Sequence, residues 1–551
     1  MTDPHQTELE TLLIPGRSWK EWGIGLLVFA LSVLYLWPFR AVTDLFWDEG
    51  IVLQGAQRIL EGEVLYRDFF SFYTPGSFYW MALLFQIFGS SYLVARTLLP
   101  IYGGIFSLLT YLLARRVCAR WSALLGAYLF LVIALPYRFL HLHNWDSLVL
   151  AYLAVYCAVR LVETPSNGWA FATGTFLSLT TLFEHSKGTG LLIGLALGFA
   201  ILAIKRSDKA PIDNVRLPAL TAGFVWPFLP VLAYFASHHA LSQMIADWTW
   251  PLFHYGESNR LPYGWINLSS QGWEALYGSG SLGHRLASVL LTSPCFIWPV
   301  IPAFALVFLI VHGLLLRKGN GGARSSMYFV MVSAGCLGLV LSAIMTTRPD
   351  VQHLLFAGAP LSVVLAWLLE ARGLASRFLQ EARPLLVAYC MVFFTAFGLT
   401  FWVHGPLDAP HQLETRRGLI KLSRPDEVIP YLTRHVTAGE KIFVYPQQPF
   451  YYFLTAARNP TAHDFLQLGM HSQAEFDEAL AQLAADQTRM VVWDPAFNTD
   501  TILQGWPATR LEMLAQDPVR DFLLAHYRPC TTLRSVDFRY VVLVRKDLSC
   551  E

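Results

Sequence analysis

The sequence predicts a polytopic α-helical membrane protein of about eleven transmembrane helices, followed by a small α/β domain. Of its 551 residues, 54% are hydrophobic and only 14% are charged, and the mean hydropathy is +0.42. A soluble domain of this length is far less apolar. Apolar runs long enough to cross a bilayer recur up to residue 403, and the pattern after them is typical of a soluble domain.

The transmembrane helices follow from the length of the apolar runs. A bilayer core of roughly 30 Å needs about 20 apolar helical residues, because unpaired backbone groups are costly in hydrocarbon. The runs that fit are 22–39, 92–114, 121–136, 145–162, 168–183, 188–204, 217–237, 287–316, 327–346, 352–371 and 384–403. No small-residue cleavage site follows the first run, so we interpret it as a retained helix. Residues 77–88 are too short to cross, which favours a helix lying partly in the interface.

Basic residues crowd the loops on one side of these helices. They are Arg115, Arg116, Arg120, Arg160, Lys205, Arg206, Lys209, Arg216, Arg317, Lys318, Arg324, Arg372, Arg377 and Arg383. The positive-inside rule assigns such loops to the cytoplasm. We therefore expect a cytoplasmic N-terminus, and we expect the opposite loops and the C-terminal domain to be extracytoplasmic.

The expected domains are a transmembrane domain, residues 1–403, and a soluble α/β domain, residues 404–551. Short β-rich runs in the second are 441–445, 489–493 and 540–544. Ser472, followed three residues later by Glu475, predicts a helix start with a capping box. The runs around Thr531 and Val541 can pair as a hairpin. Flanking this region, Cys530 and Cys550 are compatible with a disulfide and equally with two free thiols, since a bridge needs Cα atoms within about 7 Å.

Composition also argues against two classes of function. The formal net charge is only +1, and nucleic-acid binding requires a basic face that neutralises phosphates. The seven cysteines lack the short paired spacings of a zinc or iron–sulfur site. A metal–thiolate protein and a nucleic-acid-binding protein are therefore both unfavoured.

Charged side chains from four outward loops are predicted to gather at one face of the membrane. Helix capping explains each acid singly, and snorkelling of the side chain explains each cation singly. Their clustering instead favours a functional site, because paired ionisable groups mark such sites. The candidate residues are Asp48, Glu49, Arg67, Asp146, Lys187, Arg348 and His353.

These motifs resemble those of the GT-C membrane glycosyltransferases, in the bacterial branch related to protein O-mannosyltransferases and the lipid A aminoarabinose transferase. The matching features are WDEG at 47–50, GEVLY at 62–66, FGSS at 88–91 and Arg96. The resemblance implies that Asp48 and Asp146 are the catalytic acids. It also implies a bacterial inner membrane as the location.

The chain departs from that family at one position of the first loop. The family's common Lys-Pro-Pro is here Tyr73-Thr74-Pro75. A phosphate contact often assigned to that lysine is therefore expected from Arg67, Lys187 or Arg348. Glu49 and His353 complete the expected substrate-binding set.

The resemblance implies a reaction in which a hexosyl or pentosyl group moves from a polyprenyl-phosphate donor to a hydroxyl of a lipid, glycan or protein acceptor. Asp48 would be the general base. No cofactor is required by the sequence, which leaves a divalent metal open. The alternative is a transporter or lipid flippase of the cell envelope, whose charges would line a path through the bilayer. It fits less well, because the charges lie at one face and no inverted repeat is visible.

Overall fold

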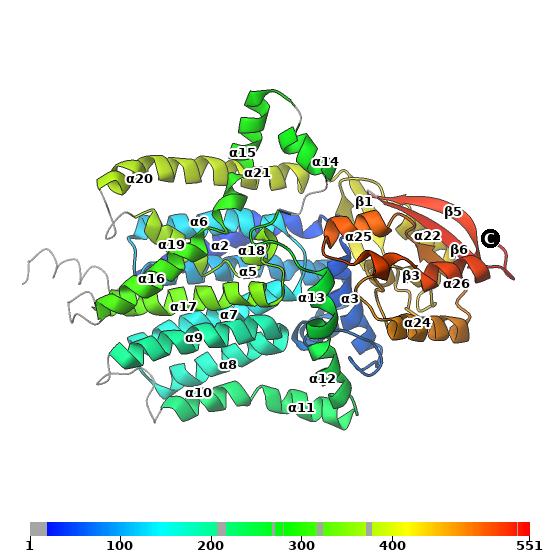
Figure 1. The fold of residues 1–551 in the computed structure, drawn as a ribbon, viewed down its shortest axis with the longest axis horizontal. Helices are drawn as coiled ribbons and strands as arrows, with labels where there is room; N and C mark the ends of the chain where they lie inside the picture. The colour runs from blue at the N-terminus through cyan, green and yellow to red at the C-terminus, as the bar shows by residue number, and fades with distance from the viewer. Residues whose placement is uncertain are drawn as a thin grey trace, which may run out of the picture.

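The chain forms a long helical bundle that carries a small sheet-containing domain at one end, as Figure 1 shows. The computed structural model describes residues 19–205, 216–266, 270–278, 280–316, 323–370, 377–536 and 538–550. Most bundle helices run along the long axis of the molecule. The helix ends that flank the basic loops lie away from the C-terminal domain, for example the end of α9 (His185–Lys205) and the start of α10 (Arg216–Val225).

The helices before the bundle midpoint are α2 (Trp19–Leu36), η1 (Trp37–Ala41), α3 (Trp47–Leu60), α4 (Gly76–Phe88), α5 (Tyr92–Ala114), α6 (Arg120–Tyr137), α7 (His143–Glu163), α8 (Asn167–Phe183), α9 and α10. Those after it are α11 (Phe228–Ser237), α12 (Leu241–Trp250), η3 (Pro251–Tyr255), α13 (Gly256–Ser258), α14 (Ser270–Trp273), η4 (Glu274–Gly278), α15 (Leu282–Ile297), α16 (Ile301–Leu315), α17 (Ala323–Met345), α18 (Val351–Phe356), α19 (Leu361–Leu368), α20 (Arg377–Tyr389), η6 (Cys390–Phe394) and α21 (Thr395–His404).

Within the described ranges, nine helical stretches are long and apolar enough to cross a membrane, and each coincides with one of the eleven expected spans. The expected span 168–183 is the 17-residue α8. The expected span 352–371 is wrong as a single helix, because it divides into α18 and α19. A Cβ at Gly358 would overlap the Trp298 indole, and Pro360 begins the second helix, so the chain breaks where this tryptophan packs. Some of the basic residues from which the membrane orientation was predicted lie outside the described residues. They are Arg206, Lys209, Arg317, Lys318 and Arg372.

Small residues bring two bundle helices into close contact. A Cβ at Gly190 of α9 would overlap the carbonyl oxygen of Gly338 in α17, and one at Gly194 would overlap that of Ala334. Small residues four positions apart allow helix backbones to approach in a membrane, where packing replaces the hydrophobic effect as the driving force. The pairing of α9 with α17 therefore depends on these glycines.

The C-terminal domain is built around a four-stranded sheet of order β3-β4-β6-β5, in which only β3 and β4 are parallel. Its elements are β1 (His411–Thr415), β2 (Gly418–Leu422), α22 (Val428–His435), β3 (Phe443–Tyr445), α23 (Phe450–Thr455), α24 (Gln473–Asp486), β4 (Met490–Trp493), α25 (Thr499–Gly505), η7 (Leu511–Leu514), α26 (Pro518–His526), β5 (Tyr527–Ser535) and β6 (Phe538–Arg545). The three expected strands are present. The capping box at Ser472 and Glu475 is confirmed at the start of α24.

The C-terminal domain shares a hydrophobic core with the membrane domain. Leu45, Val52 and Met81 are buried in the same cluster as Ile420 and Tyr540. The region after His404 is therefore packed onto the connection between α2 and α5 through one shared core.

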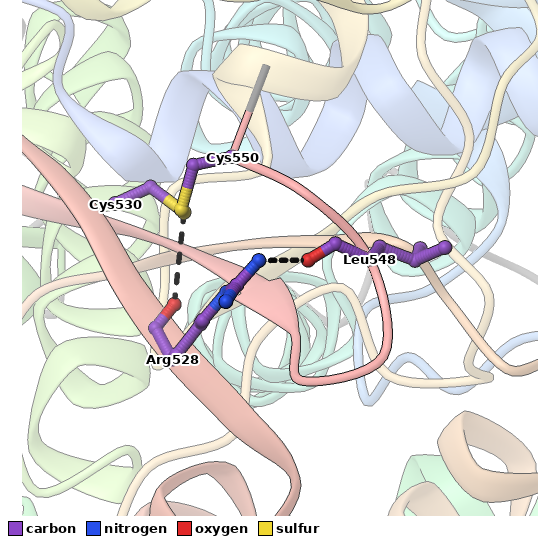
Figure 2. Close-up of a disulfide and its surroundings, with 4 residues drawn as sticks. All are labelled: Arg528, Cys530, Leu548 and Cys550. Atoms are coloured by element: carbon purple, nitrogen blue, oxygen red, sulfur yellow. Dashed lines mark hydrogen bonds between the residues drawn. A yellow bond between two sulfur atoms is a disulfide. The ribbon is translucent and has the colours of Figure 1, made fainter.

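The expected hairpin and the disulfide that flanks it are both present (Figure 2). Thr531 pairs with Val542 and Thr532 with Val541 in β5 and β6. Cys530 and Cys550 are bridged, with their Cα atoms 5.5 Å apart and a sequence separation of 20. The bridge joins the C-terminus to the start of the β5–β6 hairpin.

We predict that the Cys530→Ser/Cys550→Ser variant loses roughly 2–4 kcal/mol of stability, because the bridge restricts the unfolded chain. Thermal unfolding in detergent measures this loss. Mass spectrometry of non-reduced protein should give a linked peptide that separates on reduction. Non-reduced, denatured protein should have five alkylatable thiols, those of the free cysteines, and alkylation of all seven would contradict the bridge.

Candidate active site

Asp48 lies in the first turn of α3, within electrostatic range of basic side chains from two other connections of the chain. These side chains are Arg138, after α6, and Arg348 and His353, around the start of α18. Burial raises the pKa of Asp48 above its ordinary value, and these three groups oppose the rise without cancelling it. The arrangement combines one carboxylate with three groups able to bind an anion.

Asp350 orients two of these groups. It caps α18 by accepting from the backbone N–H of His353 at 3.0 Å, and it contacts His353 Nδ1 at 2.9 Å and Arg348 Nε at 3.3 Å. Burial alone would raise the pKa of Asp350, but His353 and Arg348 hold it at about 2. Arg348 also donates to the side-chain oxygen of Asn259. The segment before α18 is held by backbone hydrogen bonds from Leu261 N to Thr347 O, from Gly264 N to Pro349 O and from Val351 N to Trp265 O.

Arg138 is a site residue that the sequence reasoning missed. Its Nε donates to Gln352 Oε1 at 2.8 Å, and its guanidinium lies 4.7 Å from the centre of the Phe46 ring. These contacts place it between α3 and α18. The sequence did contain a signal for Arg138: it is an arginine in a loop expected on the face where short loops carry few basic residues.

Tyr73, which stands where the resembling family has a lysine, also lies at this site. Its nearest charged groups include Asp48, Glu184 and Arg348. Its ring packs on His143, with centroids 4.0 Å apart. The site therefore has a phenol in place of an ammonium at this position.

Glu49, expected to bind substrate, is buried in contacts within the protein. It is 0% exposed and forms an ion pair with Arg96, whose Nε and Nη2 each lie 2.6 Å from one of its oxygens. It also accepts from the backbone N–H of His141 at 2.9 Å. Both carboxylate oxygens are thus engaged inside the protein.

Lys187 is likewise held by internal partners. Its ammonium is 2% exposed and contacts Glu184 at 2.8 Å, Ser147 Oγ at 2.8 Å and the carbonyl of Asn144 at 2.9 Å. Burial would raise the pKa of Glu184, but Lys187 is the main influence that lowers it to about 2. All three ammonium protons have partners, so the structure does not offer Lys187 to a phosphate as we expected.

The structure does not bring the other two expected residues to the carboxylate of Asp48. Asp146 is buried in α7, where it accepts from the Tyr102 hydroxyl at 2.7 Å and lies 3.3 Å from His141 Nε2. Arg67 is 43% exposed and pairs with its neighbour Asp68 at 2.7 Å. Of the expected set, Arg348 and His353 act electrostatically on Asp48, and Lys187 adjoins this site through its partner Glu184, which acts on Tyr73.

A divalent metal has no evident donor set in this structure. Within the described ranges, no three His, Cys, Asp or Glu side chains are arranged to hold an ion.

Comparison with known proteins shows where this fold occurs. Residues 73–234 match the family described as dolichyl-phosphate-mannose-protein mannosyltransferase. The fold is similar to that of ArnT from Cupriavidus metallidurans bound to undecaprenyl phosphate, with a TM-score of 0.53 and 12% identity over 96% of this chain and 98% of that chain. The apo state of ArnT gives a TM-score of 0.55 and 13% identity over 95% and 97% of the two chains.

A further similar structure is the Archaeoglobus fulgidus oligosaccharyltransferase complex with zinc and sulfate, with a TM-score of 0.50 and 13% identity over 85% of this chain and 68% of that one. No curated protein matches the chain by sequence. The fold of the chain is thus similar to that of the ArnT and oligosaccharyltransferase structures. Residues 73–234 are in addition similar in sequence to the mannosyltransferase family.

We predict that Glu49→Gln destabilises the protein by about 3–5 kcal/mol, because it leaves Arg96 as an uncompensated buried charge. Thermal unfolding in detergent measures the loss, with Asp48→Asn as the matched control, since Asp48 lies outside this ion pair. The double variant Glu49→Gln/Arg96→Met should recover much of the stability. A Glu49→Gln protein as stable as wild type would contradict the structural role.

Proposed function

We propose that the chain transfers a sugar from a polyprenyl-phosphate-linked donor to an acceptor hydroxyl, with Asp48 as the general base. The observation that carries the proposal is a partly buried carboxylate on which Arg138, Arg348 and His353 act electrostatically, with these three side chains held by hydrogen bonds around the start of α18. A base and a set of anion-binding groups are the two parts that this reaction needs. The similarity to ArnT, solved with undecaprenyl phosphate, supports a lipid phosphate as the carrier.

In the proposed reaction, Asp48 takes the proton of the acceptor hydroxyl while its oxygen attacks the anomeric carbon. The bond from that carbon to the phosphate oxygen breaks, and the lipid phosphate leaves with the electron pair. The configuration at the anomeric carbon is inverted. Charge grows on the phosphate as it leaves, so Arg138, Arg348 and His353 stabilise the transition state more than the bound donor.

We propose that the site faces the extracytoplasmic side of the membrane. The basic loops lie at the opposite ends of the helices, which the positive-inside rule assigns to the cytoplasm. The disulfide between Cys530 and Cys550 supports the same orientation, because disulfides persist in oxidising compartments.

The transporter alternative has less support. A transport path requires polar groups near the bilayer midplane, usually on interrupted helices related by a repeat. Here the charged groups of the site lie at helix ends and in connections, on α3 and beside α18.

We predict that Asp48→Asn lowers transfer by about 10²–10⁴-fold, because the amide keeps the shape of the side chain but cannot take a proton. Radiolabelled polyprenyl-phosphate sugars, supplied as a panel to purified protein, measure transfer. The exposed Asp44 lies on the same loop, so Asp44→Asn is the matched control and should leave the rate within twofold.

The same panel gives a pH test of the base. Asp48 acts only when ionised, so transfer should fall as the pH drops through its pKa, which burial places above the ordinary value of 3.8. Transfer by Asp48→Asn within a few-fold of wild type, or an acidic limb that the substitution leaves in place, would contradict the assignment.

We predict that Arg138→Gln and Arg348→Gln each weaken binding of undecaprenyl phosphate by about 10–100-fold, because each removes a charge-assisted hydrogen bond to the phosphate. Calorimetric titration in detergent measures the affinity. Arg67→Gln is the control, since Arg67 is exposed and paired with Asp68. Equal affinities for the two site variants and this control would rule out the phosphate contacts.

A further inference from the structure

The first turn of α3 lies directly against the C-terminal domain. Gly50, two residues after Asp48, faces the start of α23, where a Cβ would overlap the backbone nitrogen of Phe450 and lie 2.8 Å from its Cα. A side chain at this position has no room unless the turn moves away. The close approach therefore requires glycine and ties the turn that carries Asp48 to the backbone of the domain.

The segment that leads into α3 is held by the same domain. Gln448 Nε2 donates to the carbonyl oxygen of Leu45 at 2.8 Å, and both residues are 3% exposed. Earlier in the segment, the backbone N–H of Thr43 donates to the carbonyl of Lys421 at 2.9 Å. The chain is thus fixed to the domain on both sides of Asp48, at Leu45 and at Gly50.

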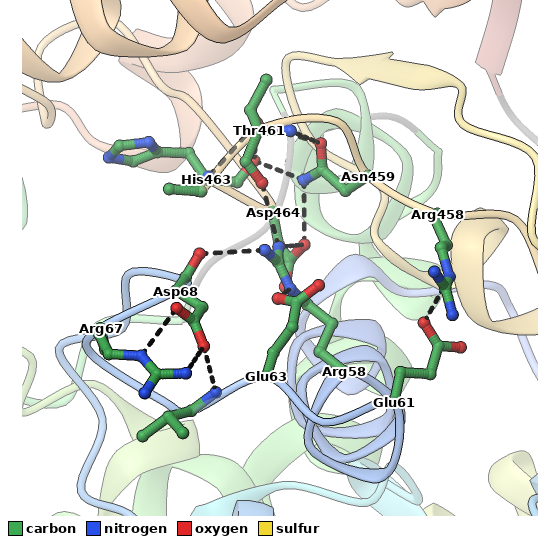
Figure 3. Close-up of polar contacts among 12 residues, drawn as sticks. Arg58, Glu61, Glu63, Arg67, Asp68, Arg458, Asn459, Thr461, His463 and Asp464 are labelled. Atoms are coloured by element: carbon green, nitrogen blue, oxygen red, sulfur yellow. Dashed lines mark hydrogen bonds and ion pairs between the residues drawn. The ribbon is translucent and has the colours of Figure 1, made fainter. Parts of the chain in front are cut away.

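The C-terminal end of α3 is anchored by a buried polar network, drawn in Figure 3. Arg58 is 5% exposed and contacts Glu63 at 2.6 Å and Asp464 of the C-terminal domain at 2.9 Å. Asn459 also donates to Asp464 at 3.0 Å. A second ion pair, between Glu61 and Arg458 at 2.8 Å, lies at the edge of this contact.

The cations of the site belong to other elements. Arg138 follows α6, while Arg348 and His353 flank the start of α18, which packs against α7 and α17 of the bundle. The base and the phosphate-binding groups are therefore carried by separate parts of the fold, and only the base lies on the helix that the C-terminal domain holds.

We propose that the C-terminal domain is a positioning element of the active site, which sets the place of Asp48 relative to the phosphate-binding cations through Gln448, Phe450 and Asp464. This inference rests on the proposed function. A displacement of about 1 Å in a catalytic group can lower a rate by about 100-fold. Changes at this contact should therefore lower turnover without weakening the binding of the lipid phosphate.

The test uses the full-length protein with Gly50→Ala, which forces the first turn of α3 off Phe450, and with Gln448→Met, which removes the bond to Leu45. Each should lower the maximal transfer rate by about 10–100-fold. Affinity for undecaprenyl phosphate should stay within twofold of wild type, and so should the midpoint of the pH dependence of binding. Arg458→Gln is the matched control, since it breaks the half-exposed ion pair of the same contact far from Asp48, and it should leave the rate unchanged.

Two outcomes would overturn the inference. One is a folded Gly50→Ala or Gln448→Met protein with a maximal rate within threefold of wild type. The other is a loss of rate matched by an equal loss of affinity for undecaprenyl phosphate, which indicates a general disturbance of the site. If Gly50→Ala does not fold, Gln448→Met decides. Transfer that persists in Asp48→Asn would instead contradict the proposed function itself.

Discussion

The buried ion pair between Glu49 and Arg96 is the interaction on which the arrangement of the site depends. It joins the start of α3 to α5, and through the N–H of His141 and the carbonyl of Phe139 it also fixes the second outward loop. Removing two charges from water is costly, and only dense hydrogen bonding compensates for it. Here both oxygens of the carboxylate are occupied, so the first turn of α3 has one favourable position. That position places Asp48 among the cations.

Adjacent acids have opposite roles because a helix turns by about 100° per residue. Glu49 points into the protein, where it meets Arg96, and Asp48 points to the site, where it meets Arg138, Arg348 and His353. Opposite charges are present on both sides. The difference is that both oxygens of Glu49 contact partners within the protein, whereas the basic groups that act on Asp48 come from separate elements of the fold.

The fold was largely predictable from the sequence, and the site only in part. Apolar length and periodicity are local properties, so the spans, the strands, the capping box at Ser472 and the β5–β6 hairpin were all recognisable. The break in 352–371 was not, because it depends on Trp298, which packs on Gly358 from a distant helix. Side-chain partners are also tertiary. Lys187 resembled a free cation in sequence, and its contacts with Ser147 and with the carbonyl of Asn144 exist only when α7 meets the start of α9.

The shared core explains how the C-terminal domain is coupled to the proposed active site. A domain joined only by a linker would move independently, and its contacts could not define a position to a fraction of an ångström. Here apolar residues of the first outward loop, including Leu45 and Val52, are buried with Ile420 and Tyr540, so separation would expose an apolar face on both parts. The polar contacts at Gln448 and Arg58 lie beside this core and are shielded by it from water. Hydrophobic burial thus makes the contact between α3 and the C-terminal domain rigid. The buried polar groups fix the position at which α3 holds the Asp48 carboxylate.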